Sequence, residues 1–245
     1  MMDKIVLRNL LKRLRALPID RADRHNVMTA PQEILDLLAA RAGIKPVCVL
    51  GRGFDDAKWI EAAVAIAKKA DLHVLEGPMW NAEPVDETLP QWFREHLRAM
   101  SPAGNAFYIC KLFNHAQAVR KSFENQPITM EEEALLLGYP LCCVQEHYER
   151  RALLYRTFYT ILDRTAKGDV AEMRRLVREK VKVTPGTQEE EADFRRATEF
   201  TLAPFTSFHI CAACAADASR PAYQVSQKYK GLVFIIDRDF VNRVT

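Results

Sequence analysis

Two groups of cysteines constrain this chain more than any other feature of its sequence. Cys142 and Cys143 are adjacent, Cys211 and Cys214 are three residues apart, and 67 residues without cysteine separate the two groups. Pro140 suits a first helical turn, and the spacing of Cys211 and Cys214 puts both on one face of a second helix. A helix N-terminus lowers a thiol pKa through its unpaired N–H groups and partial positive charge. We therefore predict one four-sulfur site built from two helix starts.

The overall composition is that of an ordinary soluble globular protein. The chain has 245 residues, 49% hydrophobic and 27% charged, and its net charge of +3 is too small to indicate nucleic-acid binding by itself. We find no apolar run near the ~20 residues of a membrane span, and residues 1–17 lack the unbroken apolar stretch of a secretory signal. Clustered cysteines without an export signal indicate metal or redox chemistry in a reducing compartment, so we expect a cytoplasmic protein with no membrane partner.

Strand and helix patterns alternate between about residues 45 and 125. Three short apolar runs lie at residues 46–50, 72–76 and 106–110. The helical patterns that follow them lie at residues 55–70, 89–100 and 114–123. This alternation predicts an α/β fold with a small parallel sheet, flanking helices and right-handed crossovers. Cys48 and Cys110 lie inside apolar runs, and we expect both in the core.

The second half of the chain is predicted to be mainly helical. Its helical patterns lie at residues 129–137, 140–167, 169–181, 189–200 and 211–219. The apolar, β-branched run at 231–236 predicts a late strand, with Pro221 interrupting the helix before it. We therefore expect an α/β region with N-terminal helices over residues 1–127, and a helical metal-site region with a late strand over residues 128–245.

A glycine-containing turn at residues 51–53 follows the first predicted strand. It lacks the third glycine of a dinucleotide-binding fingerprint, so a sharp turn explains it better. Ligands bind at the carboxyl ends of strands in α/β sheets, which makes Arg52, Asp55 and Asp56 candidates for polar contacts, with Arg52 as a possible anion contact.

Three kinds of site fit the four cysteines. A structural zinc site needs tetrahedral thiolates, but side chains of adjacent cysteines diverge by about 100° on a helix. In an iron–sulfur cluster, sulfurs that point apart can each meet a different iron, so the adjacent pair favours a [4Fe–4S] cluster, with zinc as the alternative. The third kind is a metal-free dithiol or vicinal disulfide used in redox exchange.

Two histidines and an arginine lie beside the cysteines in sequence. His147 is four residues after Cys143, on the same helix face, and His209 is two residues before Cys211. Either imidazole could ligate the metal, donate a hydrogen bond to a sulfur, or deliver protons to a substrate as a catalytic residue. Arg150 could contact an anionic substrate.

The segment Glu-Ala-Leu-Leu-Leu-Gly-Tyr-Pro-Leu-Cys-Cys-Val at residues 133–144, with the later Cys-x-x-Cys, resembles an uncharacterised prokaryotic family marked by a Gly-Tyr-Pro-x-Cys-Cys motif. The resemblance covers roughly residues 130–235. The ligand arrangement is also similar to that of epoxyqueuosine reductases, in which a Cys-Cys pair and a distant Cys-x-x-Cys hold a [4Fe–4S] cluster. In those enzymes the pair follows the first strand, whereas here it follows the α/β region. The similarity implies a cluster at Cys142, Cys143, Cys211 and Cys214.

We predict an iron–sulfur cluster-binding protein, an oxidoreductase that performs reductive or sulfur-handling chemistry on a small molecule or modified nucleoside with an electron donor. The alternative is a non-catalytic, zinc-stabilised module. It would bind RNA or protein through the basic amphipathic helix at 3–16 and the arginine-rich helix around Arg174, Arg175 and Arg178.

Overall fold

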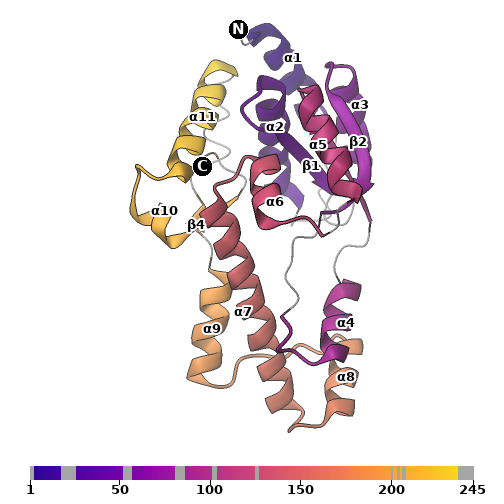
Figure 1. Ribbon diagram of the computed structural model, residues 1–245, viewed down its shortest axis with the longest axis vertical. Coiled ribbons are helices and arrows are strands. Elements are labelled where there is room, and N and C mark those ends of the chain that lie inside the picture. Colours follow the sequence, from indigo (N-terminus) through magenta and orange to yellow (C-terminus); the bar gives the residue numbers. More distant parts are fainter. Residues whose placement is uncertain are drawn as a thin grey trace. The chain divides into compact units, whose positions relative to one another are not determined.

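The computed structural model describes residues 3–17, 26–51, 57–80, 86–100, 104–124, 127–199, 201–202, 205 and 208–236 (Figure 1). Contacts divide the chain into two compact units. The first unit comprises Met1–Ala82, Pro102–Val144 and Thr201–Thr245, and the second comprises Glu83–Ser101 and Gln145–Phe200. The second unit is thus formed by two insertions into the first, a division that differs from the expected boundary at residue 127. Among the described helices, none has the length and apolarity that crossing a bilayer requires.

The fold is mixed α/β and mostly helical. The first unit contains α1 (Lys4–Arg15), α2 (Asn26–Ala42), β1 (Val47–Gly51), α3 (Ala57–Lys68), β2 (His73–Pro78), β3 (Asn105–Cys110), α5 (Phe113–Glu124), α6 (Met130–Leu137), β4 (Thr201–Leu202), β5 (His209–Ile210), α10 (Ala212–Ala216) and α11 (Pro221–Ile236). The second contains α4 (Gln91–Met100), α8 (Val170–Arg178), α9 (Gln188–Thr198) and, from Gln145 onward, α7 (Leu141–Thr165).

The three-stranded sheet is antiparallel, so the predicted parallel sheet is wrong. Its strand order is β1-β3-β2, and β3 runs antiparallel to both neighbours. The register places Pro78, the last residue of β2, opposite Asn105, the first residue of β3, so the chain leaves β2 and enters β3 at the same end of the two strands. The intervening helix α4 belongs to the second unit and is not a crossover on this sheet. The apolar pattern did not reveal this difference, because a strand buried on both faces gives an apolar run in either direction.

Both faces of this sheet are covered by helices. On one face, Cys48 and Ile109 pack in a core with residues of α1, α2, α3 and α11. On the other face, Tyr108 and Cys110 pack with residues of α5 and α6. Cys48 and Cys110 are at most 1% exposed, which confirms that both are core residues. The sheet and its helices form the main body of the first unit.

The predicted late strand at 231–236 is instead the end of helix α11, which Pro221 begins rather than interrupts. The buried residues Tyr229, Leu232, Val233 and Ile236 recur at helical spacing. They pack in the same core as α1 and α2. The β-branched run therefore supplies the buried face of a helix, because tertiary packing outweighs local strand preference.

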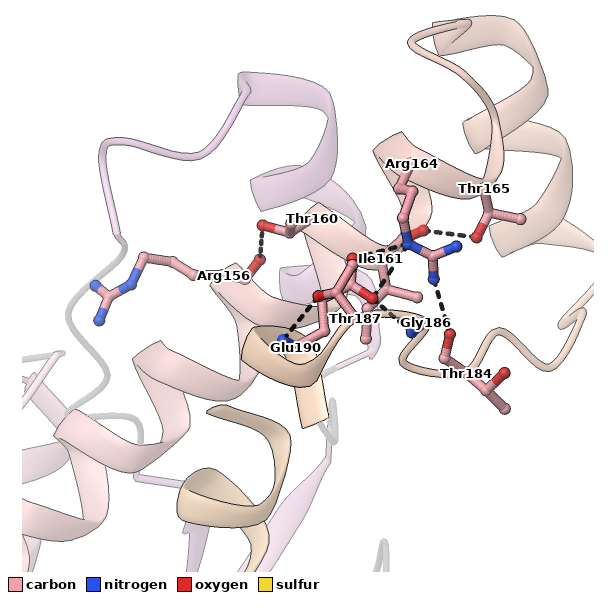
Figure 2. A network of polar contacts seen from close by, with 9 residues as sticks. All are labelled: Arg156, Thr160, Ile161, Arg164, Thr165, Thr184, Gly186, Thr187 and Glu190. Carbon is pink, nitrogen blue, oxygen red and sulfur yellow. Dashed lines mark hydrogen bonds and ion pairs between the residues drawn. The ribbon is translucent and has the colours of Figure 1, made fainter. Parts of the chain in front are cut away.

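The second unit packs α4, α7 and α8 around an apolar core that includes Phe93, Leu162 and Met173. A buried carboxylate fastens the loop before α9 to α7 (Figure 2). Arg164 donates hydrogen bonds to both oxygens of Glu190, at 2.8 and 3.1 Å, and the amide of Gly186 donates to the same carboxylate at 2.7 Å. The hydrogen bond from Arg164 is the main reason that the pKa of Glu190 lies below its usual range.

Candidate metal centre

A left-handed turn between α6 and α7 presents the first cysteine pair. Gly138 ends α6 with φ of 70°, and a Cβ atom there would lie 2.7 Å from Cδ of Pro46, so glycine meets both requirements. The carbonyl of Pro140 then accepts hydrogen bonds from the amides of Cys143 and Val144, at 2.9 and 3.1 Å. Both cysteines of the pair consequently lie in the first turn of α7, as predicted.

A short two-stranded ribbon presents the second pair. Thr201 pairs with Ile210 and Leu202 with His209, and the chain passes directly from β5 into α10. Cys211 is the N-cap of α10, and its Sγ accepts a hydrogen bond from the amide of Cys214 at 3.4 Å. The helix has five residues and is shorter than the predicted 211–219. Its capping turn still keeps the two sulfurs close.

The sulfur atoms of the four predicted cysteines lie close together, which confirms that these residues form a group able to hold a metal ion. Their Sγ atoms all lie within 4.8 Å of one another, and those of Cys142 and Cys214 are 3.7 Å apart. The amide of Cys211 donates to Sγ of Cys143 at 3.4 Å. Cys143, Cys211 and Cys214 are buried, whereas Cys142 is partly exposed. All four belong to the first unit.

The thiols of Cys142, Cys143 and Cys211 differ in their pKa. Burial raises the pKa of Cys142 to about 11, assisted by hydrogen bonds to Cys214 and Cys211, and burial likewise raises the pKa of Cys143. Burial also acts to raise the pKa of Cys211, but hydrogen bonds from the Cys214 amide and the neighbouring thiols outweigh it, so this pKa is lowered. Four thiolates this close need a cation between them, because like charges at such distances repel strongly.

A buried polar network that the sequence analysis missed adjoins the cysteines through Tyr139. Lys45 Nζ lies 2.9 Å from the Asp36 carboxylate and donates a hydrogen bond to the Tyr139 hydroxyl at 2.8 Å. Tyr229 donates to Asp36 at 2.9 Å, and the Tyr139 ring packs against Phe208, with centroids 4.5 Å apart. Burial acts to lower the pKa of Lys45, but Asp36 and Tyr139 outweigh it and raise this pKa. The signal in the sequence was a charged residue inside the otherwise apolar stretch 34–40.

The two histidines are placed by different elements. His209 is half-buried in β5, two residues before Cys211 in the first unit. His147 is half-buried in α7 within the second unit, and its ring lies edge-on to Tyr148. Burial and, secondarily, Arg151 lower the pKa of His147. The catalytic roles expected for both histidines stay predictions.

Arg150 serves a structural purpose in the second unit. Its guanidinium forms an ion pair with Glu146 at 2.7 Å and donates hydrogen bonds to the carbonyls of Arg196 and Glu199. These carbonyls lie at the end of α9, where helices leave acceptors unpaired. The expected contact with an anionic substrate stays a prediction. Arg52, Asp55 and Asp56 lie outside the described residues.

Comparison with protein-family models, curated proteins and solved structures finds no match to this chain. The resemblances to the Gly-Tyr-Pro-x-Cys-Cys family and to epoxyqueuosine reductases accordingly stay predictions. What the fold and the site define is an α/β protein with a four-cysteine group, built from two chain segments, that could hold a metal ion.

Proposed function

We propose that the protein binds one tetrahedrally coordinated zinc ion through Cys142, Cys143, Cys211 and Cys214. The sulfur separations carry this proposal. Sulfurs bound to one zinc at about 2.3 Å in a tetrahedron lie about 3.8 Å apart. Here one pair is 3.7 Å apart and all four sulfurs lie within 4.8 Å of one another. Sulfurs that each bind a different iron of a cluster lie further apart, so these distances favour a single ion.

The proposed ion has a structural role. Four cysteine ligands fill a tetrahedron and leave no position open for a substrate, which is typical of structural zinc. The ribbon of β4 and β5 has two residues per strand, and α10 has five. Elements this short are marginal without tertiary support. The ion would fasten the segment 208–216 to the start of α7 and thereby complete this part of the first unit.

A second candidate is a [4Fe–4S] cluster in an oxidoreductase, and two observations favour it. Cys142 and Cys143 are adjacent in one helical turn, where side chains diverge by about 100°. Cys142 is also partly exposed, which gives a substrate or an electron donor a route to the cluster. In this proposal His209, two residues before Cys211 in the first unit, would supply protons to a small molecule or modified nucleoside.

Metal and sulfide analysis of protein purified without oxygen separates the two candidates. We expect a colourless protein with one zinc per chain, and loss of the zinc in Cys214→Ala. Cys110→Ala is the matched control, because Cys110 is equally buried but lies outside the group, and it should keep the metal. A brown protein with about four irons and acid-labile sulfide would overturn the zinc proposal and support the cluster. Protein with neither metal would overturn both.

The structural role has its own test, by hydrogen exchange before and after chelation. The amides of Cys211 and Cys214 donate to sulfurs in the group. We expect chelation to accelerate exchange of these two amides far more than exchange in β3, because metal binding supplies folding free energy locally. Equal exchange in the two states would contradict a structural ion.

A further inference from the structure

Helices α1 and α11 concentrate positive charge on one part of the first unit. They contain seven of the 35 lysines and arginines of the chain and none of its 32 acidic residues, so the remainder of the chain is net negative. All seven basic residues are exposed. They are Lys4, Arg8, Lys12, Arg13, Arg15, Lys228 and Lys230. A chain with a net charge of only +3 thus carries a strongly basic surface.

Four of these residues form a stripe along α1. Lys4, Arg8, Lys12 and Arg15 follow one another at intervals of four, four and three residues, which places them on one side of the helix. At a rise of about 1.5 Å per residue, the stripe is about 16 Å long. A row of cationic side chains of this length can follow the backbone of a nucleic-acid strand over more than one phosphate.

The opposite side of α1 is committed to the protein core. Leu7, Leu10, Leu11 and Leu14 are only 1–4% exposed. A helix that binds a membrane surface must insert its apolar face into the lipid, and this face is unavailable. The basic stripe is therefore suited to a soluble polyanion rather than to a bilayer.

Two of the three arginines of α8, also considered as an RNA surface, are engaged elsewhere. Arg175 forms ion pairs with Glu172 at 2.7 Å and with Glu179 at 2.6 Å. The Arg174 guanidinium lies over the Trp92 ring, 5.4 Å from its centroid. Glu172 and Glu179 offset the charge of Arg175. Helices α1 and α11 contain no carboxylate within their bounds, and Asp3 precedes α1 as its N-cap.

Arg8 joins the two basic helices. Its guanidinium donates hydrogen bonds to the carbonyls of Ile235 and Ile236 at the end of α11, both at 3.3 Å. Next to these carbonyls in sequence, the Phe234 side chain is 48% exposed, with Lys230 Nζ 5.9 Å from the ring centroid. An exposed aromatic ring beside basic residues is a platform on which bases of a single strand stack.

We propose that the surface formed by α1 and α11 binds the phosphodiester backbone of single-stranded nucleic acid. Lys4, Lys12 and Arg15 contact phosphates, Arg8 joins the two helices, and Phe234 stacks on a base. This activity goes beyond metal binding and does not depend on which metal the cysteines hold. Because the contacts are mainly electrostatic, binding is modest in affinity, tolerant of sequence and strongly dependent on salt.

Fluorescence anisotropy with a labelled 20-nucleotide RNA of mixed sequence tests the proposal on the full chain. We expect Lys4→Glu/Lys12→Glu to weaken binding about tenfold or more, and to reduce the slope of log affinity against log salt by about 1.4, or 0.7 for each lost phosphate contact. Lys68→Glu/Lys121→Glu is the control, because it changes the net charge equally at exposed lysines of α3 and α5. Arg8 is left intact because of its bonds to α11. Circular dichroism verifies that each variant is folded.

Three results would overturn the proposal: no RNA binding at 50 mM salt, equal weakening in the control variant, or preferential binding to phosphatidylserine vesicles over RNA. DNA of the same sequence is measured in parallel, and similar affinity for both is expected from backbone recognition. Phe234→Ala should weaken binding of RNA several-fold without changing the salt slope, since stacking releases no counterions.

Discussion

The buried pair of Lys45 and Asp36 offers the sharpest test of how the first unit is held together. The Lys45 side chain is 1% exposed and that of Asp36 is 12% exposed, with 2.9 Å between their charged atoms. Lys45→Met fills similar space but deprives Asp36 of its cation. Breaking a buried pair from one side costs about 3–5 kcal/mol of unfolding free energy, a large part of the ~5–15 kcal/mol of a typical domain. We expect the same range for Asp36→Leu.

The double variant distinguishes the pair from two independent contributions. With both charges gone, two tyrosine hydroxyls lose a partner. Tyr229 loses the acceptor it reaches at 2.9 Å, which costs about 1–3 kcal/mol, and Tyr139 loses the donor at 2.8 Å, which costs about 1 kcal/mol. The double variant should therefore be more stable than the sum of the single variants by at least about 2 kcal/mol.

Urea unfolding, followed by tryptophan fluorescence and circular dichroism, measures these differences. Trp59 is buried in the core that α2 helps to form, and the measurement is made on a Trp92→Phe background so that the emission comes from Trp59 and Trp80 of the first unit. Lys121→Met, at an exposed lysine of α5, is the control and should change stability by less than about 0.5 kcal/mol. If Lys45→Met costs less than about 1 kcal/mol, or if the single effects add, the pair is not coupled and the reasoning fails.

Two further changes test local features. Gly138→Ala should lower the free energy of unfolding by more than the ~1–2 kcal/mol of a left-handed residue, because the new Cβ would also lie 2.7 Å from Pro46. Gly168→Ala is the control, because Gly168 has φ of 79° with open space around it and should show the backbone cost alone. Equal losses of stability in thermal unfolding would contradict the close contact with Pro46. Glu190→Gln should destabilise the second unit at pH 7 by about 1–3 kcal/mol. The hydrogen bond from Arg164 lowers the pKa of Glu190, so the stability that this carboxylate contributes is fully present above the unfolded pKa of about 4.3 and is lost as the pH falls through the folded pKa. Urea titrations in the acid range should therefore show the stabilities of wild type and variant converging. A difference that stays constant with pH would contradict the role of the Glu190 carboxylate.

The cysteine site could be predicted because its evidence is chemical and local. Cys142 with Cys143 and Cys211 with Cys214 are the residue types that bind metals, and capping at Pro140 marked where α7 begins. The separations of the sulfurs depend on how two distant segments pack, and only the structure supplies them. For this reason the adjacent pair led to a cluster as the prediction from sequence, whereas the zinc proposal rests on distances between the sulfurs that the sequence does not contain.

The errors in the fold have the same origin. The direction of β3 depends on the end of the sheet at which the chain returns after residue 101. The residues of the strand do not indicate that end, so the antiparallel direction could not be predicted from them. The 231–236 run is apolar in either a strand or a helix, and only when Tyr229 is included does the helical spacing emerge. The ion pair of Lys45 was not predicted because its partner, Asp36, lies nine residues earlier across a turn. The other partner, Tyr139, is 94 residues further along the chain, so no local spacing indicates either contact.

The interleaving of the two units has a consequence for synthesis on the ribosome. Helix α11, at the end of the described chain, packs in one core with α1 and α2, and Cys211 and Cys214 emerge only after the whole 145–200 insertion. The first unit therefore has neither its complete core nor its second ligand pair until residues 211–236 have been synthesised. Because nascent domains fold as units once their residues are available, the insertion is expected to fold first, while α1, α2 and the sheet wait with exposed apolar surface. Chaperone association during translation should accordingly concentrate on the first 80 residues.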